Sequence, residues 1–182
     1  MRYVNYVDAA KRQIYLEASG MDPKVDSYWV YGYRINFDGT GLKNLTPEAG
    51  NHQINFSKDG KYYVDTWSTV SKAPTMMLNQ TSGNEAVMHL EHGDIPKPLA
   101  AGWRPPIVFH TAGNADLGVI HPPLDLDPYK KYPVVEDIYE GPQDSFVPHT
   151  FSTRFEPLTA LGFAVAQIDG MGRTIAVRHS GA

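Results

Sequence analysis

Two apolar, β-prone runs in the second half of the chain, residues 134–139 and 163–168, are each followed by a turn that contains glycine. Residues 155–161 lie between them and form the best helix candidate, because Gly162 directly follows their end. A strand, a helix and a strand in this order predict a crossover between two parallel strands. A hairpin with strands at 107–112 and 116–121 is expected just before. The second half therefore predicts the opening of a mixed α/β sheet.

The first ninety residues instead predict short antiparallel strands joined by tight turns. We expect strands at residues 13–18, 28–37, 42–47, 53–57, 62–68, 75–79 and 86–90. Asp38-Gly39 and Asp59-Gly60 are strong hairpin signals, because both turn positions tolerate positive φ. This rhythm is typical of a propeller blade, and the twenty-one positions between the two turns predict about one and a half blades.

The composition changes between the two halves at a polar, proline-bearing stretch. We therefore predict a propeller-like part at residues 1–92, a linker at 93–105 and the start of an α/β domain at 106–182. Repeat units need neighbours to bury their faces. We accordingly expect at least the first strands to form a sheet other than a propeller meander.

Bulk composition excludes several classes of function. The chain has 182 residues, 42% of them hydrophobic, and a net charge of −4. Proteins that bind nucleic acids or membrane surfaces usually carry a basic patch, and this mildly acidic composition does not indicate one. It has no cysteine, which excludes disulfides, thiol catalysis and thiolate zinc sites. The start of the chain lacks the apolar region of a signal peptide, and no run reaches the roughly 18 apolar residues of a membrane span.

Several motifs resemble the prolyl oligopeptidase family of serine peptidases, in particular its dipeptidyl-peptidase-IV-like branch. In the second half these are residues 130–133 (K-K-Y-P), 137–142 (D-I-Y-E-G-P) and 167–172 (Q-I-D-G-M-G). In the first half, residues 55–66 resemble the last part of that family's β-propeller. The resemblance covers nearly the whole chain. It implies a β-rich α/β fold: propeller-like antiparallel strands, followed by the first strands and helix of an incomplete α/β-hydrolase sheet.

The resemblance also implies one catalytic position. In that family a Ser–Asp–His triad works with an oxyanion hole, and the tyrosine of the strand-end motif, here Tyr139, donates its hydroxyl to the hole. Asp169 and Gly170 follow the next strand, so Tyr139 and Asp169 are expected on one wall of the active site. The alternative for Tyr139 is a strand-end aromatic that packs against the next element.

Other parts of that machinery are not found in the sequence. The nucleophile of such enzymes lies in a G-x-S-x-G pattern, which does not occur here, and the triad Asp and His follow it along the chain. We expect a fragment that is inactive alone and that has neither a cofactor nor a metal site. The full-length parent is expected to act on peptide substrates. That parent is expected to be periplasmic or extracellular. Pairing through exposed sheet edges is expected to allow a homo-oligomer. The alternative is a stand-alone, non-catalytic β-rich binding module.

The remaining polar motifs predict no further chemistry. His89 and His92 are interpreted as surface residues rather than zinc ligands, and a cross-strand pair is expected for His110 and His121. Asp125 and Asp127 are interpreted as solvated turn carboxylates. Adjacent Glu136 and Asp137 point to opposite faces of a strand and therefore cannot act as an acid–base pair. Gly170-Met171-Gly172 lacks the third glycine of a nucleotide-binding loop, and Asn79-Gln80-Thr81 fits the pattern for glycosylation.

Overall fold

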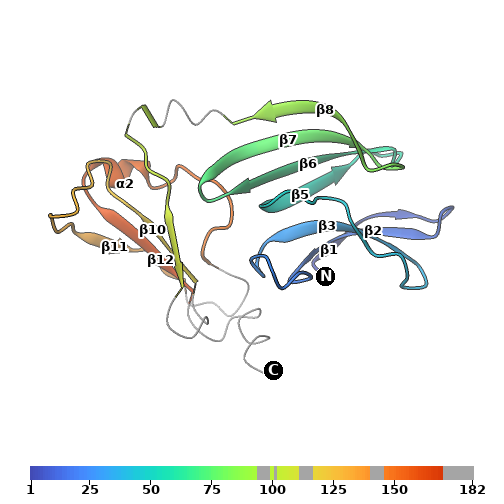
Figure 1. The fold of residues 1–182 in the computed structure, drawn as a ribbon, viewed down its shortest axis with the longest axis horizontal. Coiled ribbons are helices and arrows are strands. Elements are labelled where there is room, and N and C mark those ends of the chain that lie inside the picture. Colours follow the sequence, from blue (N-terminus) through green and yellow to red (C-terminus); the bar gives the residue numbers. More distant parts are fainter. Residues whose placement is uncertain (94–98, 101, 111–116, 140–145, 170–182) are drawn as a thin grey trace, which may run out of the picture. The chain divides into compact units, whose positions relative to one another are not determined.

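The structure is a computed structural model of residues 1–182, and it describes all of them except 94–98, 101, 111–116, 140–145 and 170–182. The chain forms two compact units, Met1–Gly93 and Asp94–Ala182. The first unit contains strands β1 to β8, and the second contains β9 to β12 and helix α2 (Figure 1). Each unit has its own sheets, so each is described by itself.

The first unit is built from two four-stranded antiparallel sheets. Sheet A has the order β1 (Tyr3–Asp8), β2 (Gln13–Ser19), β3 (Val30–Asn36) and β4 (Lys43–Asn44). Sheet B has the order β5 (Asn51–Phe56), β6 (Tyr62–Thr69), β7 (Lys72–Gln80) and β8 (Glu85–His92). Strands that are neighbours in the sequence are therefore neighbours in each sheet, which makes both sheets simple meanders (Figure 1).

This strand order corrects two of the expectations. The first strands do form a propeller-type meander, so the expectation of another sheet is wrong. The expectation of about one and a half blades, drawn from the spacing of the Asp-Gly turns, was too low. The two turns lie in two different sheets, and each sheet has four strands. The reason is that β1, which pairs along β2, supplies a fourth strand that the sequence pattern did not indicate.

The Asp-Gly turns work differently from the expected two-residue type. Gly39 and Gly60 have φ values of 84° and 66°, but Asp38 and Asp59 are not among the residues with positive φ. Each aspartate instead accepts a hydrogen bond from the amide two residues later, on Thr40 at 3.0 Å and on Lys61 at 3.1 Å. Such Asx turns satisfy the loop backbone locally. At Gly60 a Cβ would also collide with the Tyr6 ring, so glycine is required there for space as well as for φ.

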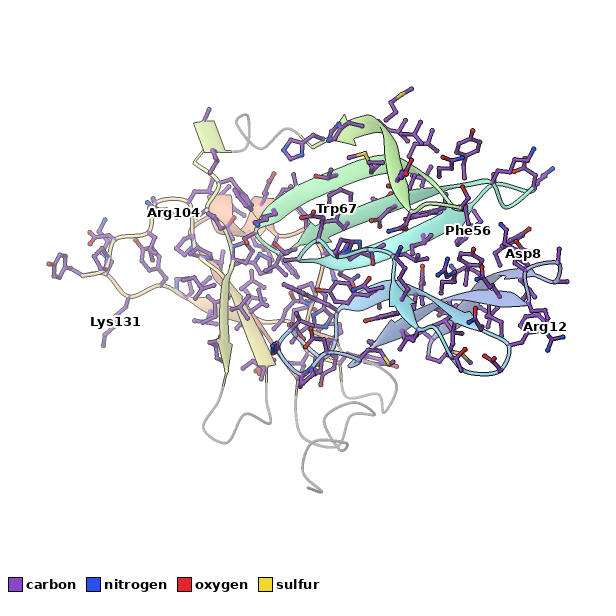
Figure 2. All side chains as sticks on the ribbon, turned by 45° about the vertical axis from the view of Figure 1, so that its right-hand side comes forward. Asp8, Arg12, Phe56, Trp67, Arg104 and Lys131 are labelled. Atoms are coloured by element: carbon purple, nitrogen blue, oxygen red, sulfur yellow. The ribbon has the colours of Figure 1, made fainter. Side chains whose placement is uncertain are left out.

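The main apolar cluster lies between the two sheets of the first unit. It joins Tyr15 of β2, Leu45 after β4, Ile54 of β5 and Tyr63 of β6, all at most 4% exposed. Phe56 packs against this cluster and is labelled in Figure 2, where Asp8 and Arg12 mark the β1–β2 hairpin. The Phe56 ring centroid lies 5.2 Å from that of Tyr15 and 5.4 Å from that of Tyr63. The cluster therefore ties sheet A to sheet B through aromatic contacts.

A buried carboxylate adds a polar link between the same sheets. Glu17 of β2 is buried, and its Oε1 accepts hydrogen bonds from the Ile54 amide of β5 at 2.8 Å and from Asn5 Nδ2 of β1 at 3.3 Å. Asn5 Nδ2 also donates to the Ile54 carbonyl at 3.1 Å. The edge strand of sheet B is thereby fastened to the face of sheet A.

We predict that Glu17→Ala lowers the free energy of unfolding by about 2–3 kcal/mol, because the buried Ile54 amide then loses its acceptor. Glu17→Gln is the matched control, since its amide oxygen can still accept that bond, and it should lose less than about 1 kcal/mol. Urea unfolding of both variants measures the difference. Equal stability of the two variants would contradict the proposed link.

The second unit contains a mixed sheet with the order β11 (Val134–Glu136), β12 (Ala164–Ile168), β10 (Leu117–His121) and β9 (Ile107–His110). Strands β9 and β10 form the expected antiparallel hairpin, whose loop at Gly113 and Asn114 lies outside the described residues. Strands β11 and β12 are parallel, and helix α2 (Glu156–Ala160) lies between them in sequence. Gly162 follows the helix with a φ of 87°. A helical crossover between parallel strands is therefore confirmed by the structure.

The expected strand at residues 134–139 is longer than the observed β11, which ends at Glu136. Its pairing with β12 ends with one further bond, from the Asp137 amide to the Ala166 carbonyl at 2.9 Å. Ile138 and Tyr139 are exposed beyond that point. Their β propensity is therefore not realised as pairing. Within the described parts of the chain, no helix combines the length and apolar content needed to cross a membrane.

Candidate functional site

The two parallel strands β11 and β12 bring their carboxyl ends to the same edge of the second sheet. Val134 pairs with Ala164 and Glu136 with Ala166, so both strands run toward that edge in register. Tyr139 follows β11 and Asp169 follows β12, which places both residues at this edge. In open α/β sheets, ligands bind in the crevice outside the carboxyl ends of the strands. This edge is the candidate site.

Asp137 fixes the chain two residues before Tyr139. Its amide extends the ladder to Ala166, and its Oδ2 accepts a hydrogen bond from Gln167 Nε2 at 3.0 Å. Gln167 is the polar interruption of the apolar strand β12, and it is buried. Arg154 lies 3.7 Å from the same carboxylate but is largely exposed, so this ion pair contributes little. The end of β11 is thus held by both backbone and side-chain bonds.

Asp169 clamps the segment that packs against Tyr139. Its side chain is buried (2% exposed), and its Oδ1 accepts hydrogen bonds from the amides of Phe146 at 2.8 Å and Val147 at 3.3 Å. The Phe146 ring centroid lies 5.9 Å from that of Tyr139, with 37° between the ring planes. Tyr139 itself is 54% exposed. A buried carboxylate therefore supports, through Phe146, an accessible tyrosine at the strand end.

The structure brings together the residues that the sequence placed on one wall. Tyr139 and Asp169 lie at the same sheet edge, as the parallel crossover requires. The sequence reasoning missed Gln167, Phe146 and Arg154. The single polar residue within an apolar strand was the available signal for Gln167. Gly141, Pro142 and residues 170–172, which the resemblance also involved, lie outside the described residues.

Comparisons with known proteins agree with this architecture. Residues 2–74 match the family model for the dipeptidyl peptidase IV N-terminal region. The crystal structure of dipeptidyl peptidase 4 from Porphyromonas gingivalis shares the fold, with a TM-score of 0.74 and 24% identity over 92% of this chain and 24% of that one. The chain is a dipeptidyl peptidase IV-like segment.

Two curated relatives extend the likeness beyond the matched region. A probable dipeptidyl-aminopeptidase B from Ajellomyces dermatitidis is 30% identical over 177 residues, which is 91% of this chain and 19% of that protein. Human dipeptidyl peptidase 8 is 27% identical over 184 residues, which is 91% of this chain and 20% of that protein. The dipeptidyl peptidase IV-like segment therefore spans about a fifth of the length of these relatives.

The histidines of this dipeptidyl peptidase IV-like segment form no metal centre among the described residues, where no group of three or more metal-ligating side chains occurs. His89 and His92 are exposed on β8, and their ring centroids are 6.3 Å apart. The expected pairing of His110 with His121 is wrong, because the hairpin register sets Leu117 opposite His110. His121 instead pairs with Val165 of β12.

The other polar motifs also have structural roles. Asp127 Oδ1 accepts a hydrogen bond from the Tyr129 amide at 3.0 Å, and the Tyr132 hydroxyl donates one to the Asp125 carbonyl at 2.8 Å. The loop is therefore held by hydrogen bonds among its own residues. Asn79 of the glycosylation pattern is buried in β7. Its side chain is therefore inaccessible in the folded segment.

A small pocket in the second unit offers room for about one water molecule. It is lined by Trp103, His121, Phe155, Glu156 and Thr159, among others. His121 Nε2 and Glu156 Oε1 are both buried without a protein partner, and burial lowers the pKa of the His121 imidazole. The residues that line this pocket do not include the strand-end residues Tyr139 and Asp169.

Proposed function

We propose that the dipeptidyl peptidase IV-like segment belongs to a serine peptidase that removes dipeptides from peptide substrates. In this proposal the second unit is the opening part of an α/β-hydrolase domain. Two observations support it: the mixed sheet with its β11–α2–β12 crossover, and the exposed Tyr139 at the carboxyl end of β11. The relatives named dipeptidyl-aminopeptidase B and dipeptidyl peptidase 8 have the corresponding activity in their names.

The single observation that carries the proposal is the supported, accessible position of Tyr139. When a nucleophile attacks a peptide carbonyl, negative charge develops on the carbonyl oxygen. A hydroxyl already fixed in place stabilises this charge without reorganising at the moment of reaction. Phe146 and Asp169 provide the fixed support, and the exposure of Tyr139 leaves it within reach of a substrate. Tyr139 would therefore act as an oxyanion-hole donor.

The chain alone should not hydrolyse peptides, because its sequence contains no G-x-S-x-G nucleophile elbow. We expect the purified chain to release no chromophore from dipeptide-proline substrates above the buffer rate. A longer protein that contains such an elbow should be active and should lose its activity to a serine-directed phosphonate. Activity of the isolated chain that the phosphonate abolishes would overturn this part of the proposal.

A stand-alone β-rich binding module is the second candidate. Every residue of the edge strand β8 is exposed, including Val87, Met88 and Leu90. Exposed edges with apolar side chains can pair with a second chain. We propose that a second copy of this chain is the partner at this edge.

Light scattering coupled to size-exclusion chromatography tests this pairing. We expect a concentration-dependent dimer, and Met88→Lys should shift it to a monomer, because a charge on an edge strand opposes pairing. Leu161→Lys is the control, since Leu161 is exposed after helix α2 and is not part of strand β8. A wild-type chain that stays monomeric at every concentration would argue against this edge as an interface.

A further inference from the structure

His52 of β5 has an acceptor on each of its two ring nitrogens. Its Nδ1 lies 2.9 Å and 3.1 Å from the two carboxylate oxygens of Asp65 on β6. Its Nε2 lies 2.8 Å from the backbone carbonyl oxygen of Glu48, in the connection between β4 and β5. Both His52 and Asp65 are buried, with 2% and 5% of their surfaces exposed.

The chemistry of these two acceptors indicates the protonation state of the His52 imidazole. An ionised carboxylate and a backbone carbonyl can only accept hydrogen bonds. A neutral imidazole has one N–H donor and one nitrogen lone pair. It could therefore donate to only one of the two oxygens, and its lone pair would face the other oxygen without a hydrogen bond. An imidazolium has an N–H on each nitrogen and satisfies both oxygens at once. The contacts at 2.8 and 2.9 Å are in the range of such charge-assisted bonds.

Two aromatic rings lie close to the His52 ring and favour the same charge state. The Trp67 centroid is 5.7 Å away with 17° between the planes, and the Tyr31 centroid is 5.1 Å away with 34°. Trp67, labelled in Figure 2, sits at the opposite end of the β5–β6 pair from Phe56. Aromatic faces attract cations at these distances. Burial raises the pKa of the Tyr31 hydroxyl, so that ring stays neutral.

We propose that His52 is a buried imidazolium that locks the connection between sheets A and B. One N–H binds Asp65 within sheet B, and the other holds the Glu48 carbonyl of the chain that enters sheet B from sheet A. The titratable side chains that face the ring are Asp65 from β6 and Tyr31 from β3. The imidazolium and the Asp65 carboxylate form an ion pair, and both ring nitrogens of His52 already have protein acceptors.

Nitrogen NMR of the whole chain tests the charge state directly. In a long-range proton–nitrogen spectrum, an imidazolium shows two nitrogens with similar shifts, whereas a neutral ring shows two widely separated shifts. At pH 7.5 an ordinary histidine, with a pKa of about 6.5, is mainly neutral. We expect the imidazolium pattern for His52 at this pH, assigned by its disappearance in His52→Gln. A neutral pattern for His52 in the folded wild-type chain would overturn the proposal.

A variant of the carboxylate provides the second measurement. Asp65→Asn leaves the buried ring without its counter-ion, and we expect the unfolding equilibrium to shift by at least a hundredfold toward the unfolded chain. His89→Gln, on exposed β8, is the control and should shift it less than threefold. An Asp65→Asn chain as stable as wild type would contradict the lock. If this variant does not fold, the wild-type spectrum alone decides the proposal.

Discussion

Tyr139→Phe, made in a protein that continues this chain to its nucleophile, should lower kcat by about 10²–10³-fold and leave KM nearly unchanged. The hydroxyl that is removed stabilises charge only in the transition state, and one such donor contributes about 3 kcal/mol to lowering the barrier. Phenylalanine preserves the ring contact with Phe146, so the strand end keeps its support. Steady-state kinetics with a dipeptide-proline substrate measure both constants.

Tyr129→Phe is the matched control for this experiment. Tyr129 is 95% exposed in the turn before β11, and its hydroxyl should contribute nothing to either constant. A Tyr139→Phe enzyme with wild-type kcat would mean that Tyr139 is only a packing residue at the end of β11. A rise in KM with unchanged kcat would instead indicate that the hydroxyl contacts the substrate equally in the ground state.

Tyr63→Ala should lower the free energy of unfolding of the chain by about 3–5 kcal/mol, the largest loss of stability that we predict. Tyr63 is 1% exposed within the cluster that joins sheets A and B, and its hydroxyl bonds to the Leu45 carbonyl and to Asn84. Truncation removes apolar contacts and leaves a cavity between the sheets. Tyr62→Ala is the control, since the neighbouring side chain is 41% exposed and should lose less than about 1 kcal/mol.

The same residue makes the stability of the chain depend on alkaline pH. Burial raises the pKa of the Tyr63 hydroxyl above its ordinary value of 10.0. The unfolded chain therefore loses this proton first, and the free energy of unfolding falls as the pH rises above about 10. Tyr63→Phe should remove up to about 1.4 kcal/mol per pH unit from this slope. An unchanged slope in that variant would show that other groups cause the alkaline loss.

Much of the strand content could be predicted, because it follows from local patterns. Alternating β-prone residues indicated β2, β3, β5, β6 and the central part of β7, each within a few residues of its observed bounds. Strand β1 was missed. It is a half-exposed edge strand with polar positions at Asn5 and Asp8, and its pairing with β2 determines its structure more than its own composition. Local patterns contain no information about such pairing.

The candidate site could be predicted in part. The order of strand, helix and strand was enough to place Tyr139 and Asp169 at one edge, since parallel strands end on the same side. The support from Phe146 was not predictable, because it depends on a hydrogen bond between residues 23 positions apart. The His52 surroundings were missed for the same reason: they combine β3, β5, β6 and a loop carbonyl.

The two kinds of strand order also imply different folding speeds for the two units. In the first unit each strand pairs with its neighbour in the sequence, as where Gln80 pairs with Glu85, so closing each hairpin loses little chain entropy. In the second unit β12 must find β10 and β11 across long intervening segments, as where Gly118 pairs with Ile168. Folding slows as the sequence separation of contacts grows. The meanders of the first unit should therefore form before the mixed sheet, and would be in place while the Tyr139 edge is still assembling.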